Sequence, residues 1–410
     1  MVAPFLPDDE KLTAVRDALP ALAAGIYLNT GSAGPMPAET AAAMDEIAEY
    51  ELRTGRSHPD YFAGFLERLE EARGAVAAVI GAEIEEVAIT HSTSVAMNSA
   101  IGAVPLAAGR RIVSTRSEHA AGLGPVFAAA ERAGAEAVLV EVDDGADDAE
   151  IVARFDRAIT SNTAVVMVSH VLWTSGRLLP IPAIAAIGRD RGSIVVVDGA
   201  QAAGAIPVAV HELGAHFYGL PGQKWLLGPE STAGLWVDPA FVERSRPPLV
   251  GWFNYAEIGP DAARLHPNAR RFDGTQFHKP SVTGLARSCG WLSMYVGLPW
   301  IHARGQAMAR AAAERLAAID GVELVTPLDR MATLVTFRIA GWTPDEALSE
   351  LSARVFAVAR TIPIINALRI SVGFFTTEDE IARFVRTVEL LASHTPATLP
   401  PRPRLTVLGV

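Results

Sequence analysis

Lysine and cysteine are both scarce in this chain of 410 residues. Lys11, Lys224 and Lys279 are the only lysines among 35 basic residues, and Cys289 is the only cysteine. A single cysteine cannot form an intramolecular disulfide, so nothing indicates an oxidising compartment. A general bias towards alanine and arginine accounts for the arginines, whereas each remaining lysine has to be considered by its own setting.

An excess of positive charge and a long apolar run are also missing. Asp and Glu outnumber Lys and Arg by 46 to 35, which gives a formal net charge of -11. Nucleic acids and anionic membranes are contacted through clustered basic side chains, so neither is an expected partner. No apolar run approaches the roughly 20 residues that span a bilayer, and the first residues lack the basic flank of a signal peptide. We expect a cytoplasmic enzyme or binding protein without a metal site.

Short β-rich runs alternate with alanine-rich amphipathic segments between residues 26 and 240. Strands separated by helices of this length are typical of βαβ units, in which helices cover both faces of a mostly parallel sheet. The sequence therefore predicts an α/β protein with a large, seven-stranded sheet. The predicted strands are 87–90, 111–114, 137–142, 164–169, 194–198, 216–218 and 235–237, and the helical patterns include 62–80, 126–133 and 182–191.

The pattern changes after residue 240. Residues 244–275 are rich in proline, glycine and arginine, and irregular stretches of this length are usually functional or lie at an interface. The remainder predicts a smaller α+β domain, whose last helix begins with Thr376 or Thr377 and Glu380 in a capping box. Its predicted elements are a long helical stretch over 282–316, strands at 323–325, 332–339 and 367–372, a helix from about residue 343 and a helix over 377–393.

These patterns suggest a division of the chain into four parts. We expect residues 1–25 to pack with the small domain, residues 26–285 to form the large cofactor-binding domain, residues 286–395 to form the small domain, and residues 396–410 to form an extended, proline-rich tail.

Two polar residues stand in apolar surroundings. Asp198 ends the apolar run 194–197, and ligands of open α/β sheets bind beyond the carboxyl ends of strands, although an Asp there can also simply cap a helix. Lys224 is flanked by a glycine, a tryptophan and two leucines. A desolvated lysine has a lowered pKa and can attack an aldehyde; the alternative is a lysine whose stem lies along the edge of the core.

Three further features suit an anionic, planar ligand. Thr93 and Ser94 follow the strand 87–90 at the start of a helix, where free backbone N–H groups can hold a phosphate. His119 follows a strand end and can stack on a ring. Arg369 interrupts an apolar strand, where a guanidinium is costly unless it meets an anion. Helix capping, a structural histidine and a structural ion pair are the respective alternatives.

Together, these features meet the requirements of pyridoxal 5'-phosphate. Its phosphate needs a helix end, its ring a stacking partner, its ring nitrogen a carboxylate and its aldehyde an amine. Along the chain, the candidate phosphate site at Thr93 and Ser94 comes first, followed by His119, Asp198, Lys224 and Arg369.

The chain resembles the class V aminotransferase family of fold-type I pyridoxal-phosphate enzymes, which includes cysteine desulfurases and isopenicillin N epimerase-like proteins. The resemblance runs from residues 27–35 through the Asp-Gly-Ala-Gln run at 198–201 and the Lys-Trp-Leu-Leu-Gly-Pro run at 224–229 to residues 368–371. It implies the fold-type I architecture, a large domain with a mostly parallel seven-stranded sheet between helices plus the smaller C-terminal domain.

The resemblance also implies a role for individual residues. Lys224 is the catalytic lysine that forms a Schiff base with the cofactor, Asp198 pairs with the ring nitrogen, and Arg369 binds the substrate carboxylate. Thr275 lies in a loop that lends a phosphate ligand to a neighbouring subunit, which implies a homodimer with shared active sites. The implied cofactor-binding residues are Thr93, Ser94, His119, Trp173, Asp198, Gln201, Gln223, Lys224 and Thr275, and the implied substrate-binding residues are Asn29, Ser32 and Arg369.

Three departures from the family pattern bear on the reaction. Desulfurases carry a cysteine shortly before the arginine strand, but residues 360–366 contain none, which disfavours a persulfide-forming desulfurase. Many relatives have an asparagine where this chain has Trp173. Desulfurases often have a histidine directly before the lysine, where this chain has Gln223.

The residues listed are compatible with several fates of an amino-acid substrate, because a released Lys224 can act as general acid and base in each. We expect a C–S lyase that performs β-elimination on a cysteine S-conjugate in a biosynthetic pathway. Epimerisation, transamination and decarboxylation-coupled deamination stay open, as does a structural relative without catalytic activity.

Overall fold

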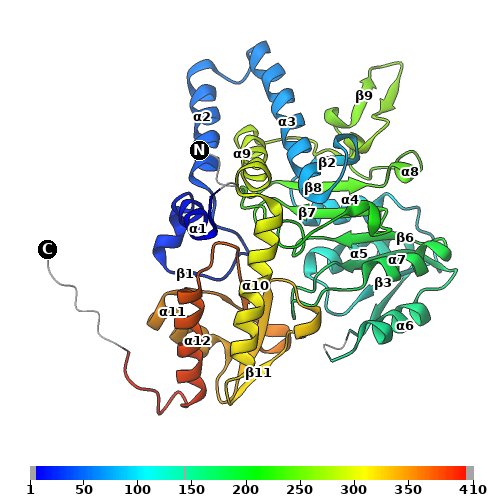
Figure 1. Ribbon diagram of the computed structural model, residues 1–410. Coiled ribbons are helices and arrows are strands. Elements are labelled where there is room, and N and C mark those ends of the chain that lie inside the picture. Colours follow the sequence, from blue (N-terminus) through cyan, green and yellow to red (C-terminus); the bar gives the residue numbers. More distant parts are fainter. Residues whose placement is uncertain (1–5, 143–144, 403–410) are drawn as a thin grey trace.

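A seven-stranded sheet forms the centre of the computed structural model, which describes residues 6–142 and 145–402 (Figure 1). The strand order is β2-β8-β7-β6-β5-β3-β4, and β8 pairs antiparallel with both of its neighbours while the other pairs are parallel. The predicted mostly parallel sheet is therefore confirmed, with shifts at several strand ends. The strands are β2 (Val87–Thr90), β3 (Arg111–Thr115), β4 (Glu136–Val140), β5 (Thr163–Ser169), β6 (Ile194–Asp198), β7 (Phe217–Pro221) and β8 (Ala233–Val237).

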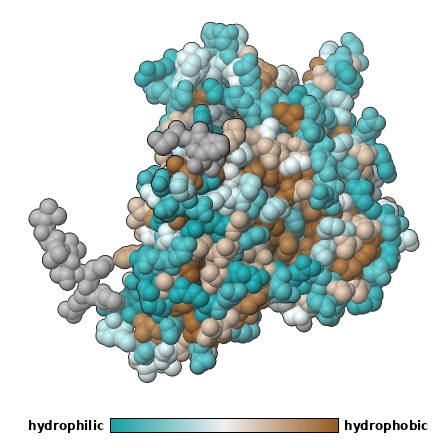
Figure 2. All heavy atoms as spheres, in the orientation of Figure 1, coloured by the Kyte–Doolittle hydropathy of each residue, from teal (hydrophilic) through white to brown (hydrophobic). Residues whose placement is uncertain are grey.

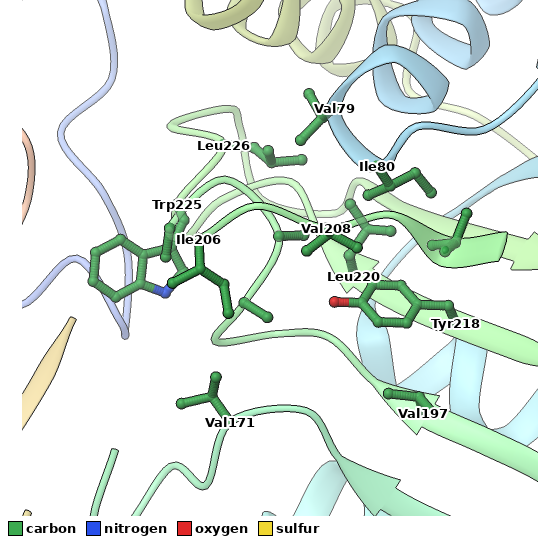
Figure 3. Close-up of a cluster of buried hydrophobic side chains, with 14 of the residues drawn as sticks. Val79, Ile80, Val171, Val197, Ile206, Val208, Tyr218, Leu220, Trp225 and Leu226 are labelled. Atoms are coloured by element: carbon green, nitrogen blue, oxygen red, sulfur yellow. The ribbon is translucent and has the colours of Figure 1, made fainter. Parts of the chain in front are cut away.

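Helices cover both faces of this sheet. Side chains alternate across a strand, so Val195 and Val197 of β6 join one hydrophobic cluster while Val196 joins another. Figure 3 shows Val197, together with Tyr218 of β7, in the first cluster. The helices of this part are α3 (Pro59–Ile80), α4 (Thr93–Gly102), α5 (Ala120–Ala133), α6 (Asp148–Ala158), α7 (Ile181–Asp190) and α8 (Pro239–Val242).

A second sheet lies beside the first and is formed, in the described part of the chain, by four antiparallel strands in the order β11-β12-β15-β14 (Figure 1). The predicted smaller α+β unit is confirmed, and Thr377 with Glu380 forms the capping box of the last helix. The elements are β11 (Val322–Leu324), β12 (Leu334–Ile339), β14 (Arg360–Ile362), β15 (Ala367–Ser371), α10 (Leu298–Ala317), α11 (Pro344–Val355) and α12 (Glu378–Ala392).

The N-terminal part of the chain contacts both units. Strand β1 (Ile26–Tyr27) pairs in parallel with β13 (Ala357–Val358), and Ile26 belongs to the hydrophobic cluster of the second sheet. Helices α2 (Ala38–Thr54) and α3 pack on α9 (Lys279–Gly290), and Figure 2 shows mostly hydrophilic side chains over the projecting ends of α2 and α3. The proposed domain boundaries stay a prediction, and residues 1–5 and 403–410 lie outside the described residues.

The lysines outside the predicted site each lie over an aromatic ring. Lys11, in α1 (Asp8–Asp17), is buried, and its Nζ is 4.7 Å from the ring centroid of Trp300. Lys279 Nζ is 3.8 Å from the ring centroid of Tyr61. These cation–π contacts give both lysines a structural role in the fold.

Two segments differ from the sequence prediction. The helical stretch over 282–316 is divided into α9, a π-helical segment Trp291–Val296, and α10, because Gly297 adopts a φ of 93° and Pro299 starts a new helix. The stretch over 244–275 contains a hairpin of β9 (Tyr255–Ile258) and β10 (Ala263–Leu265) between short 3₁₀ turns. Among the described residues, no helix is long and apolar enough to cross a membrane.

A buried ion pair joins α3, β2 and the segment that precedes Thr275. Arg73 donates from Nη1 and Nη2 to the two carboxylate oxygens of Asp273, both at 2.9 Å, and from Nη1 to the Val87 carbonyl at 2.7 Å. The backbone N–H of Ile89 also donates to Asp273, at 2.9 Å. Because both charged groups are almost fully buried and every bond links distant segments, this pair fixes where the chain around residue 274 lies.

We expect Asp273→Ala to lower the free energy of unfolding by about 3–5 kcal/mol, because it leaves the buried guanidinium of Arg73 without its main partner. Glu49→Ala, which breaks the exposed pair with Arg53, is the matched control and should cost no more than about 1 kcal/mol. Urea unfolding of both variants measures the difference, and equal losses would contradict a structural role for the buried pair.

Candidate active site

A cavity of about 250 Å³ lies where the carboxyl ends of the large sheet face the second sheet. Its walls combine residues from the large sheet and its helices with residues of β14 and β15, which are far away in the sequence. All but two of the predicted site residues line this cavity. Those that do are Ser32, Thr93, Ser94, His119, Trp173, Asp198, Gln201, Gln223, Lys224 and Arg369.

Asp198 is placed by the end of β6. It pairs in register with Ser169 at the end of β5, and its carboxylate is almost fully buried. One oxygen, Oδ1, accepts a hydrogen bond from the Ala200 N–H at 2.8 Å. Ala200 lies in a turn and not in a helix, so the helix-capping alternative is wrong, and the other carboxylate oxygen is available to a ligand in the cavity. Burial raises the pKa of Asp198, while the charge of Lys224 and the Ala200 hydrogen bond oppose that shift.

Lys224 follows β7 and reaches the same cavity. Burial lowers its pKa to about 8, and the positive charges of Arg369 and Arg360 act in the same direction. The negative charge of Asp198 opposes the shift. At pH 7 about a tenth of the amine is therefore neutral and nucleophilic, far more than for an ordinary lysine.

The start of α4 forms a wall that suits a phosphate. Ser92 is the N-cap, and its Oγ accepts a hydrogen bond from the Val95 N–H at 3.2 Å. Thr93 and Ser94 occupy the first turn, where backbone N–H groups have no partner within the helix. Ser92 also lines the cavity, although the sequence assigned only Thr93 and Ser94 to the site.

His119 is the N-cap of α5, and its Nδ1 accepts a hydrogen bond from the Ala121 N–H at 3.1 Å. Burial lowers its pKa to about 4, and the positive charges of Lys224, Arg360 and Arg369 contribute to this shift. The imidazole is therefore neutral at pH 7 and keeps its proton on Nε2. A neutral ring in this position is free to stack on a planar ligand.

A buried carboxyl beneath the cavity was not recognised in the sequence. Glu118 accepts hydrogen bonds from the Ser169 N–H at 2.9 Å and the Thr115 hydroxyl at 3.0 Å, and the Ser169 hydroxyl donates to it as well. Burial raises its pKa to about 7. Glu118 thus ties the end of β3 to Ser169 at the end of β5, which is the register partner of Asp198.

Two guanidinium groups, those of Arg369 and Arg360, lie in the same cavity. Arg369 in β15 is fully buried and donates from Nη1 to the Trp173 carbonyl at 2.6 Å, while its Nε and Nη2 have no protein partner among the described residues. Burial and the charge of Arg360 lower the pKa of Arg369 to about 9. Arg360 in β14 is its cross-strand neighbour and donates to the Ser32 hydroxyl at 3.3 Å.

The structural ion pair considered for Arg369 is absent from the residues that the structure describes, and Arg360 has no acidic partner there either. The sequence had marked Arg369 but not Arg360, because only the pairing of β14 with β15 brings the two together.

The remaining predicted residues support the cavity or lie outside it. Gln201 donates from Nε2 to the Gly31 carbonyl at 2.9 Å and accepts from the Trp225 indole at 3.0 Å. Asn29 is not in the lining, but its carbonyl accepts from the Ser32 N–H at 2.9 Å and so helps to place Ser32. Thr275 does not line the cavity of its own chain. No group of three or more His, Cys, Asp or Glu suited to a metal occurs within 6–142 and 145–402.

The chain belongs to the class V aminotransferase family, whose model matches residues 26–384. It is 27% identical over 395 residues to a probable cysteine desulfurase of Methanothermobacter thermautotrophicus, covering 92% of this chain and 97% of that protein. It is 28% identical over 390 residues to isopenicillin N epimerase of Streptomyces clavuligerus, covering 90% of this chain and 95% of that protein.

Solved structures share the fold. A cysteine desulfurase from Thermococcus onnurineus NA1 aligns with a TM-score of 0.82 at 26% identity, covering 96% of this chain and 100% of that one. A cystine C–S lyase, C-DES, aligns with a TM-score of 0.86 at 22% identity, covering 92% of this chain and 100% of that one. The predicted fold type, family and pyridoxal-phosphate dependence are therefore confirmed, and the chain is an enzyme of this family.

The cavity fits that cofactor in its chemistry. The start of α4 offers N–H groups to a phosphate, Asp198 offers a buried oxygen and Lys224 an amine with a lowered pKa. The unpartnered donors of Arg369 require an anion, because a buried donor without a partner costs free energy.

The pKa of Lys224 should respond in opposite directions to two substitutions. Asp198→Asn removes a negative charge and should lower the pKa below about 8, whereas Arg369→Gln removes a positive charge and should raise it. The pH dependence of amine labelling in the cofactor-free protein, followed by mass spectrometry, measures both. Labelling of Lys279 in the same samples is the control and should not change; shifts of Lys224 in the same direction would contradict this electrostatic account.

Proposed function

We propose that this enzyme is a C–S lyase that performs β-elimination on a cysteine S-conjugate whose sulfur substituent carries a second carboxylate. The observation that supports this proposal is the presence of two guanidinium groups, Arg360 and Arg369, without an acidic partner among the described residues. The involvement of such a substrate in a biosynthetic pathway is part of the same proposal.

The charge of the cavity favours a substrate with two anionic groups. Like charges placed opposite each other on neighbouring strands repel, and a buried guanidinium is costly without an anion. Arg369 presents Nε and Nη2, which match the two oxygens of one carboxylate. Arg360 is then left for a second carboxylate. Cystine, the substrate in the name of the structural relative C-DES, has two carboxylates.

The cofactor would be held by residues already described. Lys224 would bind it covalently through Nζ, Asp198 would face the ring nitrogen, and His119 would stack on the ring, with Ser92–Ser94 at the phosphate. When bound, pyridoxal phosphate draws electrons from the substrate Cα and makes its proton acidic. The neutral imidazole of His119 adds no positive charge against that ring.

Lys224 would move the proton in the elimination. Once the substrate amine has taken its place, Lys224 is released, and its neutral amine can accept the Cα proton and the resulting ammonium can return a proton to the departing sulfur. The Cβ–S bond breaks with its electron pair going to sulfur, and hydrolysis of the remaining three-carbon unit yields pyruvate and ammonia. Arg369 would hold the carboxylate in place, which disfavours loss of carbon dioxide.

The cysteine of this chain supports a lyase over a desulfurase. Cys289 is fully buried in α9, and burial raises the pKa of its thiol to about 12. A desulfurase needs an accessible thiolate to take sulfur from its substrate. Cys289, the only cysteine of the sequence, does not meet that requirement, because it neither lines the cavity nor ionises near neutral pH.

We expect the purified holoenzyme to release pyruvate and ammonia from cystine, with a lower KM than for S-methylcysteine, which has one carboxylate. Arg360→Gln should raise KM for cystine by about 10-fold and leave S-methylcysteine almost unchanged, since a charge-assisted bond is worth about 1.5–3 kcal/mol. Lys224→Ala should abolish turnover and the visible absorbance of lysine-bound cofactor.

Arg338→Gln, on β12 outside the cavity, is the matched arginine control. Conversion of the cofactor to its amine form would indicate transamination, and solvent deuterium at Cα of recovered substrate would indicate epimerisation; either as the main outcome contradicts the lyase proposal. A colourless protein that takes up no cofactor would point to a non-catalytic relative.

We also infer that the enzyme acts as a homodimer in which Thr275 reaches the cavity of the partner. The inference is supported by the position of Thr275 outside its own cavity and by exposed apolar residues nearby in the sequence, Leu249 at 61% and Trp252 at 57% exposure. Sedimentation should give one species of twice the chain mass, and Trp252→Glu should shift it towards monomer. A monomeric, fully active wild type would contradict the shared site.

A further inference from the structure

Trp173 contacts both arginines of the cavity, one through its backbone and one through its ring. We propose that Trp173 is a positioning residue that sets the Arg360–Arg369 pair to receive two carboxylates. The inference rests on the proposed function, because it names the residue that organises the subsite for the second carboxylate. It concerns the position at which many relatives have an asparagine.

The contact with Arg369 is rigid because the loop that carries Trp173 is bound to the second sheet. The Thr336 hydroxyl donates to the Thr174 carbonyl at 2.7 Å, and the Thr326 hydroxyl donates to the Ser175 carbonyl at 2.6 Å. Gly176 closes this loop with a φ of 77°, where a Cβ atom would lie 2.5 Å from the Leu334 carbonyl oxygen. The Trp173 carbonyl is therefore held at a fixed place, and with it Nη1 of Arg369.

Orientation of Arg369 follows from that bond. Because Nη1 is used by the Trp173 carbonyl at 2.6 Å, Nε and Nη2 remain as the pair of parallel donors for a carboxylate. The protein thereby decides which edge of the guanidinium meets the substrate.

The contact with Arg360 is made by the indole. The guanidinium carbon of Arg360 lies 5.7 Å from the Trp173 ring centroid, within the range of a cation–π interaction. Its other polar contacts among the described residues are the Ser32 hydroxyl at 3.3 Å and the Thr361 carbonyl at 3.4 Å, and neither is charged. The electron-rich face of Trp173 therefore holds Arg360 beside Arg369 and leaves its positive charge available to a ligand. An acidic side chain in the same place would neutralise that charge.

The same ring also contacts the residue assigned to the cofactor. The edge-to-face contact between Trp173 and His119 has a centroid separation of 5.1 Å and an interplanar angle of 87°. Trp173 thus contacts both His119, which is assigned to the cofactor, and Arg360, which is assigned to the second carboxylate. An asparagine in this position has no aromatic face for either neighbour, so we assign the preference for a doubly charged substrate to the tryptophan.

Calorimetry of the holoenzyme with two inert probes tests this proposal. Glutarate carries two carboxylates and butyrate carries one. Trp173→Leu removes the aromatic face and keeps the backbone carbonyl. It should therefore weaken the binding of glutarate by about 3- to 30-fold and the binding of butyrate by less than about 2-fold. Trp173→Phe keeps an aromatic face and should retain most of the glutarate preference. Trp173→Met, an unbranched and flexible side chain that also lacks an aromatic ring, repeats the test should the leucine variant fail to fold.

The double variant Trp173→Leu/Arg360→Gln identifies the route of the effect. If Trp173 acts through Arg360, the double variant should bind glutarate no more weakly than Arg360→Gln alone. Additive losses, or equal losses in the Phe and Leu variants, would overturn the assignment to the aromatic face.

The design separates this inference from the proposed function. Loss of glutarate preference in Arg360→Gln but not in Trp173→Leu would overturn the role of Trp173 and leave the second-carboxylate subsite in place. An unchanged preference in Arg360→Gln would overturn the subsite itself. Arg338→Gln serves as the control for a change in surface charge, and it should leave both probes unaffected.

Discussion

Buried positive charge is the constraint on which this site depends. Lys224, Arg360 and Arg369 share a small cavity in which Asp198 supplies the opposing charge. Burial and mutual repulsion lower the pKa of Lys224 and keep His119 neutral, and they leave the arginines to be satisfied by a ligand. The same arrangement thus provides a nucleophilic amine, an uncharged stacking ring and a demand for anions, which is the combination that a pyridoxal-phosphate enzyme for amino acids requires.

The fold meets this constraint by bringing two sheets to one cavity. The large sheet ends in Asp198 and is followed by Lys224, while the second sheet contributes both arginines. The loop that carries Trp173 leaves the large sheet and is bound by threonine hydroxyls of the second unit, so it joins the two halves of the site. Because the large sheet supplies Asp198 and Lys224 and the second sheet supplies both arginines, the site is complete only when the two units are packed together.

The parts of the site that the sequence predicted are those with a local signature. A carboxylate at the end of an apolar strand, hydroxyl residues before a helix and a lysine among apolar residues are each visible within a few positions, and Asp198, Thr93, Ser94 and Lys224 all line the cavity. Arg360 and Glu118 were missed because their significance comes from strand pairing and burial. Asn29, which the resemblance assigned to the substrate, is not in the cavity lining, and its carbonyl accepts a hydrogen bond from the Ser32 N–H.

The sequence by itself determined the α/β class and the positions of the seven strands, and it singled out Lys224 as the lysine in apolar surroundings, because hydrophobic periodicity and local composition carry that information. Only the tertiary structure decided that Lys11 and Lys279 lie over aromatic rings, that Arg360 stands opposite Arg369 and that Trp173 touches both. These facts depend on the register of strands and the packing of segments far apart in the chain. Contacts between segments far apart in the chain are set by the packing of the whole folded core, so they cannot be predicted from any short stretch of sequence.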